Sequence, residues 1–352
     1  MNGETNEELI LGAQPLHGPM PAIDPFIFCV YHQDAYPAGN GKLGLDPVLL
    51  QGRNIGMDFS GQDGWSMYHG DSVPGFPAHP HRGFETVTIV RQGLVDHSDS
   101  LGATARYGEG DVQWLTTGRG VQHAEMFPLV HQDRGNTLDL FQIWLNLPAR
   151  NKMAPPDFTM FWARDIPRAA HTDAQGRRSE VEVIAGDYAP LEGAPRRIAA
   201  LAPPADSWAS EPGADVAIWI IRLEPQASLT LPLAAGARTR RTLSFFSGAS
   251  LYVGAQRYDR RVVAEVRASQ PLPLRNDSDG VVEVLLLQGR PIGEPVAARG
   301  PFVMNSQQEL AQAIQDYQRT GFGGWQWPDA AHTHGDSARY ARHPDGRVER
   351  PD

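Results

Sequence analysis

The sequence is poor in the residues that several common classes of protein require. Its 352 residues include a single cysteine, Cys29, which excludes an intramolecular disulfide framework and a cysteine-rich zinc site. No segment approaches the ~18 consecutive apolar residues that a membrane-spanning helix needs. The acidic start also lacks an apolar stretch of signal-peptide length. We therefore expect a cytoplasmic protein that makes no use of a membrane.

Positive charge is scarce as well. The chain has 31 lysines and arginines against 41 aspartates and glutamates, so its net charge is −10, and it has no long basic run. Such a chain repels phosphate backbones, which argues against direct nucleic-acid binding. No long amphipathic seam is visible, and a monomer is therefore the expected state.

Glycine and proline are abundant instead. The 36 glycines and 29 prolines make up about 18% of the chain, against an average near 12%. This composition favours short elements joined by tight turns, as in an all-β protein. Short β-branched or aromatic runs of strand length predict strands, and they occupy residues 26–31, 43–50, 84–90, 111–117, 138–147, 181–186, 216–223, 228–233, 242–248, 250–254 and 281–289.

These runs fall into two β-rich halves. The expected organisation is an N-terminal segment over 1–25, a first domain over 26–165, a second domain over 166–320, and a loose polar tail over 321–352, with 149–180 as a connecting stretch. One helix is expected near the end of the second domain, with Asn305 as its N-cap. Its apolar stripe consists of Leu310, Ile314 and Tyr317.

The 12 histidines are unevenly spread, because half of them cluster in the first domain and none lies between 172 and 331. Two pairs stand two residues apart beside strand-like runs: His79 with His81, and His123 with Glu125. Alternate residues of a strand share a face, so two such pairs on neighbouring strands bring three imidazoles and one carboxylate to one point. This set predicts a site for one divalent metal ion. Iron(II) suits it, and manganese, nickel, copper or zinc also fit.

Other residues with metal-binding groups are less suitable. Glu85 is the rival carboxylate, but an extended strand would place it ~13 Å from His81, so Glu125 is preferred. Three histidines lack a partner at the same spacing and are interpreted as surface residues or as residues behind the ligands: His69, His97 and His131. A last pair lies in the expected tail and is interpreted as solvated: His332 and His334.

The sequences around the two pairs resemble those of the pirins, which are members of the cupin superfamily. The matching stretches are HPHRGFETV at 79–87, GEGDVQWLTTGRGVQHAEMF at 108–127, LDLFQIWLNLP at 138–148 and GPFVMN at 300–305. The resemblance covers most of residues 20–320 in order. It implies an all-β bicupin of two stacked antiparallel β-barrel or jelly-roll domains with a C-terminal helix. The first domain would hold one metal ion, usually iron, and the second none.

Carried over position by position, the resemblance implies four metal ligands: His79, His81, His123 and Glu125. Some bacterial pirins resemble quercetin 2,3-dioxygenase in activity, and Glu125 would then also act as the catalytic base. Other pirins are nuclear cofactors that modulate transcription factors. Three interpretations stay open. The chain is a dioxygenase that takes dioxygen and quercetin or a related aromatic enol, a metal-dependent cofactor or redox sensor for a protein partner, or a metal-bearing cupin without chemistry.

Overall fold

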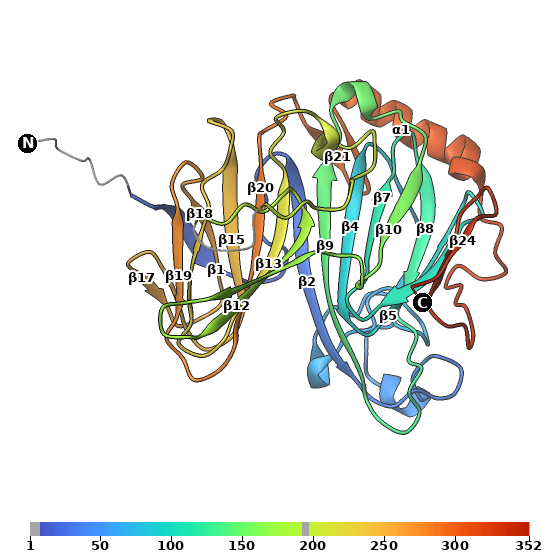
Figure 1. Ribbon diagram of the computed structural model, residues 1–352. Coiled ribbons are helices and arrows are strands. Elements are labelled where there is room, and N and C mark those ends of the chain that lie inside the picture. The colour runs from blue at the N-terminus through green and yellow to red at the C-terminus, as the bar shows by residue number, and fades with distance from the viewer. Residues whose placement is uncertain (1–7, 192–196, 352) are drawn as a thin grey trace, which may run out of the picture. The chain divides into compact units, whose positions relative to one another are not determined.

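The computed structural model describes residues 8–191 and 197–351 (Figure 1). Contacts within the chain divide these residues into two compact units. The site unit combines Val30–Arg164 with the residues from Glu294 onward, and the second unit combines the residues up to Cys29 with Asp165–Gly293. Each unit thus takes two separate stretches, whereas the ranges drawn from the sequence are continuous.

The site unit is built from two antiparallel sheets. The six-stranded sheet contains, in spatial order, β24 (Val348–Glu349), β23 (Tyr340–Arg342), β6 (Thr104–Gly108), β5 (Leu94–Asp99), β8 (Val121–Met126) and β3 (Gly75–His81). The five-stranded sheet contains β10 (Asp157–Phe161), β7 (Val112–Thr116), β4 (Phe84–Gln92), β9 (Asn136–Asn146) and β2 (Phe26–Tyr36). Alternate residues of both sheets meet in one core, for example Val121 of β8 with Leu115 of β7 and Leu140 of β9.

The second unit has the same kind of architecture. Its seven-stranded sheet contains β1 (Ile10–Pro15), β18 (Val262–Val266), β15 (Arg240–Ser247), β20 (Val282–Gly289), β13 (Ala217–Leu223), β12 (Arg178–Ala185) and β11 (Arg168–Thr172). Its four-stranded sheet contains β14 (Ser228–Leu231), β19 (Leu272–Asn276), β16 (Leu251–Val253) and β17 (Gln256–Tyr258). A single apolar core, which includes Trp219, Phe245 and Leu286, fills this unit.

The all-β prediction is confirmed, with two local exceptions. Residues 43–50 do not form a strand, because Pro47 has no N–H for a ladder and the Asp46 side chain accepts a hydrogen bond from the Val48 amide at 2.9 Å. A short 3-10 helix, Pro47–Leu50, results. The expected connection over 149–180 instead contains β10, β11 and the start of β12. The other 3-10 helices are Gln62–Gly64, Ala149–Asn151, Trp208–Ser210 and Gly321–Gly323.

The predicted helix is present as α1 (Gln307–Thr320), after a hairpin of β21 (Ala297–Arg299) and β22 (Phe302–Met304). Its N-cap is Ser306 and not Asn305, because the Ser306 hydroxyl accepts a hydrogen bond from the Glu309 amide at 3.2 Å. The Glu309 carboxylate in turn accepts one at 2.9 Å from the amide of Asn305, the residue before the N-cap, so it holds the chain that enters the helix. Gly321, in the left-handed conformation, ends the helix.

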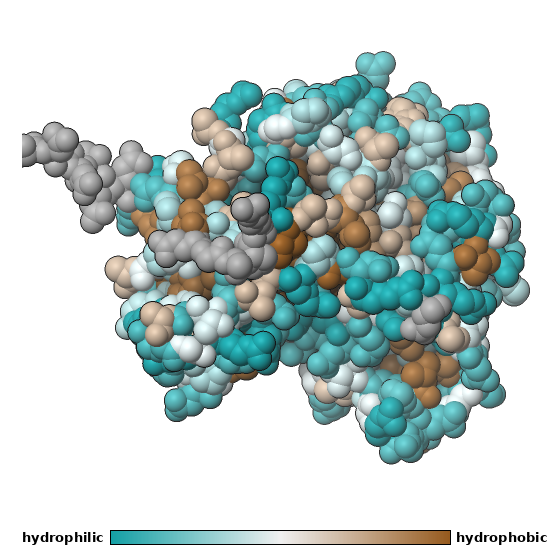
Figure 2. Space-filling view, in the orientation of Figure 1, coloured by the Kyte–Doolittle hydropathy of each residue, from teal (hydrophilic) through white to brown (hydrophobic). Residues whose placement is uncertain are grey.

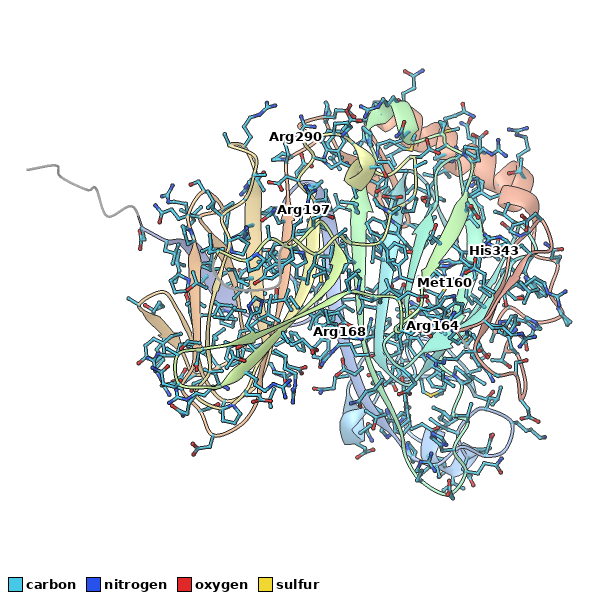
Figure 3. All side chains as sticks on the ribbon, in the orientation of Figure 1. Met160, Arg164, Arg168, Arg197, Arg290 and His343 are labelled. Atoms are coloured by element: carbon cyan, nitrogen blue, oxygen red, sulfur yellow. The ribbon has the colours of Figure 1, made fainter. Side chains whose placement is uncertain are left out.

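The stretch after α1 is polar, but the prediction of a loose tail is wrong. β23 pairs with β6, and β24 pairs with β23. His334, expected to be solvated, is half-buried, and its Nε2 lies 2.8 Å from the carbonyl oxygen of His97. His343, labelled in Figure 3, stacks on Phe158 of β10 with ring centroids 4.7 Å apart. The partners of this stretch lie some two hundred residues earlier, so local sequence carries no sign of them.

The apolar residues are concentrated in the two cores. On the face shown in Figure 2, hydrophobic residues occur in small groups among hydrophilic ones. None of the helices in the described parts of the chain is long and apolar enough to cross a membrane.

Candidate metal centre

Two neighbouring strands bring the predicted histidines together. β3 and β8 are antiparallel and in register, with His79 opposite His123 and His81 opposite Val121. Each of His79, His81 and His123 offers one ring nitrogen to the cluster. These three nitrogen atoms lie within 4.8 Å of one another. The ring centroids of His79 and His123 are 4.5 Å apart. The strand geometry expected from the two-residue spacing therefore produces a convergent cluster.

All three imidazoles are in an environment that favours their neutral form. Burial lowers the pKa of His79 to about 4 and holds the pKa values of His81 and His123 well below their ordinary range. His79 Nδ1 lies 2.8 Å from the carbonyl oxygen of Pro77, so Nδ1 carries the proton and Nε2 keeps its lone pair. Neutral imidazole with a free lone pair is the form that binds metal ions.

Several nitrogen atoms of the cluster lack a partner in the protein. His123 is fully buried, and within the described residues neither of its ring nitrogens makes a hydrogen bond; the same holds for His81 Nδ1. An unsatisfied buried polar group costs about 1–3 kcal/mol. A divalent cation at the cluster would satisfy such lone pairs, and nitrogen donors suit ions of intermediate softness. The residues present thus fit a metal ion.

Glu125 lies beside this cluster, with its Oε2 3.8 Å from His123 Nε2. Two side chains contact the carboxylate: Gln142 Nε2 donates to its Oε2 at 3.2 Å, and Thr88 Oγ1, whose single proton is shared with Gln142 Oε1 at 2.5 Å, lies 3.2 Å from its Oε1. Burial raises the pKa of Glu125, while His97 and these two hydrogen bonds act in the opposite direction. The three histidines form the convergent group, and the predicted ligation by Glu125 stays a prediction.

The structure adds residues that the sequence did not single out. Thr88 and Gln142 orient the carboxylate, and both are polar residues on the inner face of strands whose neighbours are apolar. The alternation of polar and apolar residues in FETVTIV and LDLFQIWLNL was the sequence pattern that could have identified these two residues. Glu85 is next to Thr86 on β4, so it projects from the opposite face to Thr88. Its Oε1 accepts a hydrogen bond from Thr116 Oγ1 at 2.7 Å.

The remaining histidines of the first half differ from one another. His97 on β5 is fully buried, and its ring centroid lies 5.5 Å from that of His123. Its Nε2 lies 3.2 Å from Asp99 Oδ2, so it stands directly behind the cluster. His69 is exposed, with Nδ1 2.7 Å from the carbonyl oxygen of Gly56. His131 is half-buried and lines a cavity elsewhere.

Arg82, which directly follows His81, ties the two histidine motifs to α1. Its Nε donates to the carbonyl oxygen of Arg119 at 2.7 Å, just ahead of the second motif. Its NH1 donates to Asp316 Oδ2 on α1 at 2.9 Å, and this guanidinium lowers the pKa of Asp316 to about 2. The guanidinium also lies 4.5 Å from the ring centroid of Phe322. The helix therefore braces the loops next to the strands that carry the clustered histidines.

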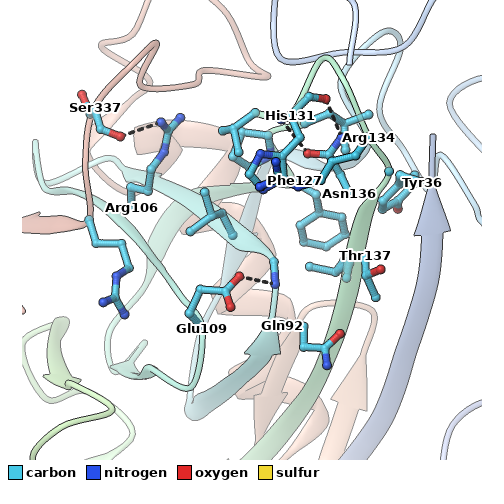
Figure 4. A pocket seen from close by; sticks show the side chains of 18 of the residues that line it. Tyr36, Gln92, Arg106, Glu109, Phe127, His131, Arg134, Asn136, Thr137 and Ser337 are labelled. Atoms are coloured by element: carbon cyan, nitrogen blue, oxygen red, sulfur yellow. Dashed lines mark hydrogen bonds between the residues drawn. The ribbon is translucent and has the colours of Figure 1, made fainter. Parts of the chain in front are cut away.

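A cavity of about 660 Å³ also opens in the site unit (Figure 4). The three clustered histidines do not line it, and its labelled lining residues are Tyr36, Gln92, Arg106, Glu109, Phe127, His131, Arg134, Asn136, Thr137 and Ser337. Arg106 donates to the carbonyl oxygen of Ser337 at 2.8 Å, and Glu109 accepts from the Gly93 amide at 3.0 Å. Two of its charged groups are thus already engaged within the protein.

Comparisons with known proteins agree on one family. The family model Pirin matches residues 49–145, and the model Pirin C-terminal cupin domain matches residues 218–323. A Pseudomonas aeruginosa protein named "Putative quercetin 2,3-dioxygenase" is 38% identical over 249 residues, which cover 70% of this chain and 79% of that protein. Pirin-1 of Arabidopsis thaliana is 33% identical over 261 residues, 71% of this chain and 78% of its own. A solved quercetin 2,3-dioxygenase structure from Acinetobacter baumannii matches with a TM-score of 0.66 and 27% identity, covering 90% of this chain and 98% of that one.

Proposed function

Because the chain belongs to the pirin family, we propose that it is a metal-dependent dioxygenase that acts on quercetin or a related flavonol. The family and the bicupin fold were both expected from the sequence, and the comparisons confirm them. The observation that carries the proposed activity is the cluster of three neutral histidines, two buried and one half-buried, whose ring nitrogens include several without a partner in the described protein. The names of the related proteins in Pseudomonas and Acinetobacter support the choice of substrate.

The proposed ligands of one divalent ion are His79, His81, His123 and Glu125. Iron(II) is the expected metal, and manganese, nickel, copper and zinc are alternatives. When bound, such an ion supplies Lewis acidity, which lowers the pKa of a hydroxyl group brought to it. One ion per chain is expected, because no histidine lies between 172 and 331, the part of the sequence that supplies most of the second unit.

The chain's own residues provide the other requirements of the reaction. Glu125, whose carboxylate lies within hydrogen-bond distance of Thr88 and Gln142, is the proposed acceptor of the proton of the substrate's 3-hydroxyl group. Two half-buried aromatic side chains flank the cluster: Trp144, whose ring centroid is 5.3 Å from that of His81, and Phe76, 6.3 Å from His79. Their faces can stack on a flat ring system and exclude water from it.

The test is turnover by metal-loaded protein. The chain is loaded with iron(II) without oxygen, mixed with quercetin and then exposed to air, while flavonol absorbance and carbon monoxide are followed. We expect quercetin to disappear with release of carbon monoxide, and His123→Ala to abolish both. His171→Ala, in the second unit, is the matched control and keeps full activity. Bound iron without turnover in the unmodified protein would leave the metal site standing and refute the flavonol activity.

The contact between Arg82 and Asp316 favours a second candidate, a metal-dependent cofactor or redox sensor for a protein partner. This contact connects the residue after a proposed ligand to α1, most of whose residues are exposed. A change at the metal would then reach the surface through one hydrogen-bonded pair. The expected result is a partner that is retained on the iron-loaded protein in only one oxidation state and is lost with Asp316→Asn. Equal retention in both states refutes this candidate.

A further inference from the structure

Three side chains near the histidine cluster form a hydrogen-bonded chain to which the proposed reaction assigns no role. His32 and Asp34 are two residues apart on β2 and project from the same face of the strand. Tyr68 Oη donates to Asp34 Oδ2 at 2.7 Å, and His32 Nδ1 lies 2.8 Å from the same Oη. Asp34 Oδ1 accepts from the Ser66 amide at 2.8 Å. The buried Asp34 has no ion-pair partner among the described residues. The hydrogen-bonded series therefore consists of the Asp34 carboxylate, the Tyr68 phenol and the His32 imidazole.

This arrangement fixes which nitrogen of His32 carries the proton. The single proton of the Tyr68 hydroxyl points to Asp34, so the Tyr68 oxygen can only accept a hydrogen bond from His32. Nδ1 is therefore protonated, and Nε2 keeps a lone pair. Burial lowers the pKa of His32 to about 4, which keeps the ring neutral at physiological pH. No hydrogen bond to His32 Nε2 occurs within the part of the chain that the structure describes.

His32 is linked to the candidate metal centre through one aromatic ring, that of Phe76. β2 is the edge strand of the five-stranded sheet, and β3 is the edge strand of the six-stranded sheet. The ring of Phe76 on β3 joins the two, with its centroid 5.9 Å from His32 and 6.3 Å from His79. All three side chains are half-buried and thus partly accessible. One aromatic ring separates the free nitrogen of His32 from the histidine cluster.

The backbone of Tyr68, the middle residue of this hydrogen-bonded series, is strained. Its φ is 58°, in the left-handed region that a bulky side chain rarely adopts. Reciprocal backbone hydrogen bonds with Asp58, of 2.8 and 2.9 Å, keep it there. Such strain persists only where the surroundings over-determine it, and it is concentrated at functional sites.

We propose that His32 binds the aromatic substrate, accepting a hydrogen bond through Nε2 from a hydroxyl group remote from the one that reacts. Asp34 and Tyr68 are positioning residues that keep His32 in the tautomer with the lone pair on Nε2. Phe76 supplies the surface on which the ring system lies between the two ends. The inference rests on the proposed function and narrows its substrate class to flat, polyhydroxylated aromatic compounds.

Two flavonols separate this role from a structural one. Quercetin carries hydroxyl groups on both ends of its ring system, and 3-hydroxyflavone keeps only the reacting hydroxyl. Binding of each to the metal-loaded, oxygen-free protein is measured by quenching of tryptophan fluorescence. We expect His32→Phe to weaken quercetin binding by about tenfold, the value of one hydrogen bond, and to leave 3-hydroxyflavone binding unchanged. The matched control is His171→Phe, which removes an imidazole also paired to a tyrosine hydroxyl, Tyr188 at 3.0 Å, in the second unit.

The tautomer is measured separately by nitrogen-15 NMR of the histidine rings. We expect His32 to carry its proton on Nδ1 in the unmodified protein. In Asp34→Asn the new amide donates to Tyr68, so the phenol proton turns to His32 Nδ1 and the ring proton moves to Nε2. Quercetin binding should then weaken while 3-hydroxyflavone binding does not.

The outcomes distinguish the inference from the function on which it rests. An Nε2-protonated His32 in the unmodified protein, or an equal loss of both flavonols in His32→Phe, overturns the inference and leaves the dioxygenase proposal standing. If the unmodified protein binds neither flavonol, the proposed function fails, and the inference fails with it.

Discussion

Lys152 is one of two lysines in the chain, and it is buried next to the first histidine motif. Its Nζ donates to the carbonyl oxygen of Gly83 at 2.8 Å, to Asn146 Oδ1 at 2.7 Å and to the carbonyl oxygen of Val303 at 3.1 Å. The ammonium group thus joins the loop after His81 to β9 and β22. Burial lowers its pKa from 10.5 to about 8. Replacing it with methionine, of similar length, removes the charge and the three hydrogen bonds.

The sign of the pH effect follows from the direction of the shift. The unfolded chain binds the proton of Lys152 more tightly than the folded chain, so protonation disfavours folding below pH 8. The shift from 10.5 to about 8 corresponds to about 3 kcal/mol, and this cost disappears as the pH rises from 8 to 10.5. Between pH 7 and pH 9.5 the unmodified protein should therefore gain about 2 kcal/mol of stability from this one group.

Lys152→Met changes both the stability and its pH dependence. At pH 7 it leaves three buried acceptors without a donor, at about 1 kcal/mol each, but it also removes the cost of about 3 kcal/mol of burying the protonated amine, so we expect the two proteins to be nearly equal in stability at this pH. The variant also lacks the gain on raising the pH, and the difference between the two proteins should widen by about 2 kcal/mol at pH 9.5. Urea denaturation followed by tryptophan fluorescence at both pH values measures these differences. Lys42→Met replaces the other lysine, which is exposed, and should change neither.

Two results would contradict this account of Lys152. A variant that is as stable as the unmodified protein at pH 9.5 would mean that the hydrogen bonds of Lys152 do not hold the loop. A difference that narrows as the pH rises would mean that the three acceptors raise the pKa of Lys152 more than burial lowers it. The sign of the pH effect is therefore the more informative measurement.

Three further predictions concern the site unit. Gly120→Ala, with a φ of 123° and a new Cβ 2.7 Å from the ring of Phe322, should destabilise the protein by about 2 kcal/mol in thermal melts, and Phe322→Ala should relieve part of that loss in the double variant. Arg106→Met leaves the buried carboxylate of Asp96 without the two hydrogen bonds, of 2.6 and 2.7 Å, that it accepts from Arg106. We expect this variant to lose about 3–5 kcal/mol of stability in urea denaturation, and the double variant with Asp96→Asn to recover part of that loss. Thr88→Val removes a hydrogen bond to the carboxylate of Glu125 and should weaken iron binding about 10-fold or more in a chelator competition, without changing the fold. An unchanged affinity for iron would mean that Glu125 is not a ligand.

The strand pattern was predictable where local sequence decides it. Runs such as FETVTIV and VEVLLLQG combine β-branched residues with bounding glycines, and both are strands. The run at 43–50 has similar hydrophobicity, but a proline and a hydrogen bond that the Asp46 side chain accepts from the Val48 amide override it. β23 and β24 form from polar segments, because β6 supplies hydrogen bonds to β23 and β23 supplies them to β24. Such pairing depends on contacts distant in sequence, which local propensity does not report.

The residues around the candidate metal centre were likewise predictable only where local sequence decides their position. The spacing of two residues in each motif was enough to predict that His79, His81 and His123 converge, because strand periodicity is a local property. The chain of His32, Asp34 and Tyr68 was not predictable. Its members come from β2 and from a loop more than thirty residues later, and Tyr68 needs a left-handed backbone that its own sequence does not favour.

The C-terminal segment is better understood as part of the candidate metal centre than as an addition to the fold. Val303 accepts a hydrogen bond from Lys152, which also holds the loop after His81. Asp316 binds the Arg82 side chain in that same loop. Phe322 covers Gly120, ahead of the second motif, so closely that no side chain fits there. Three separate contacts thus fix the loops that adjoin the histidine-bearing strands, while the pairing of β3 with β8 aligns the strands themselves. Preorganisation of ligands depends on such supporting contacts as much as on the ligands, which explains why a chain segment so far along the sequence joins this unit.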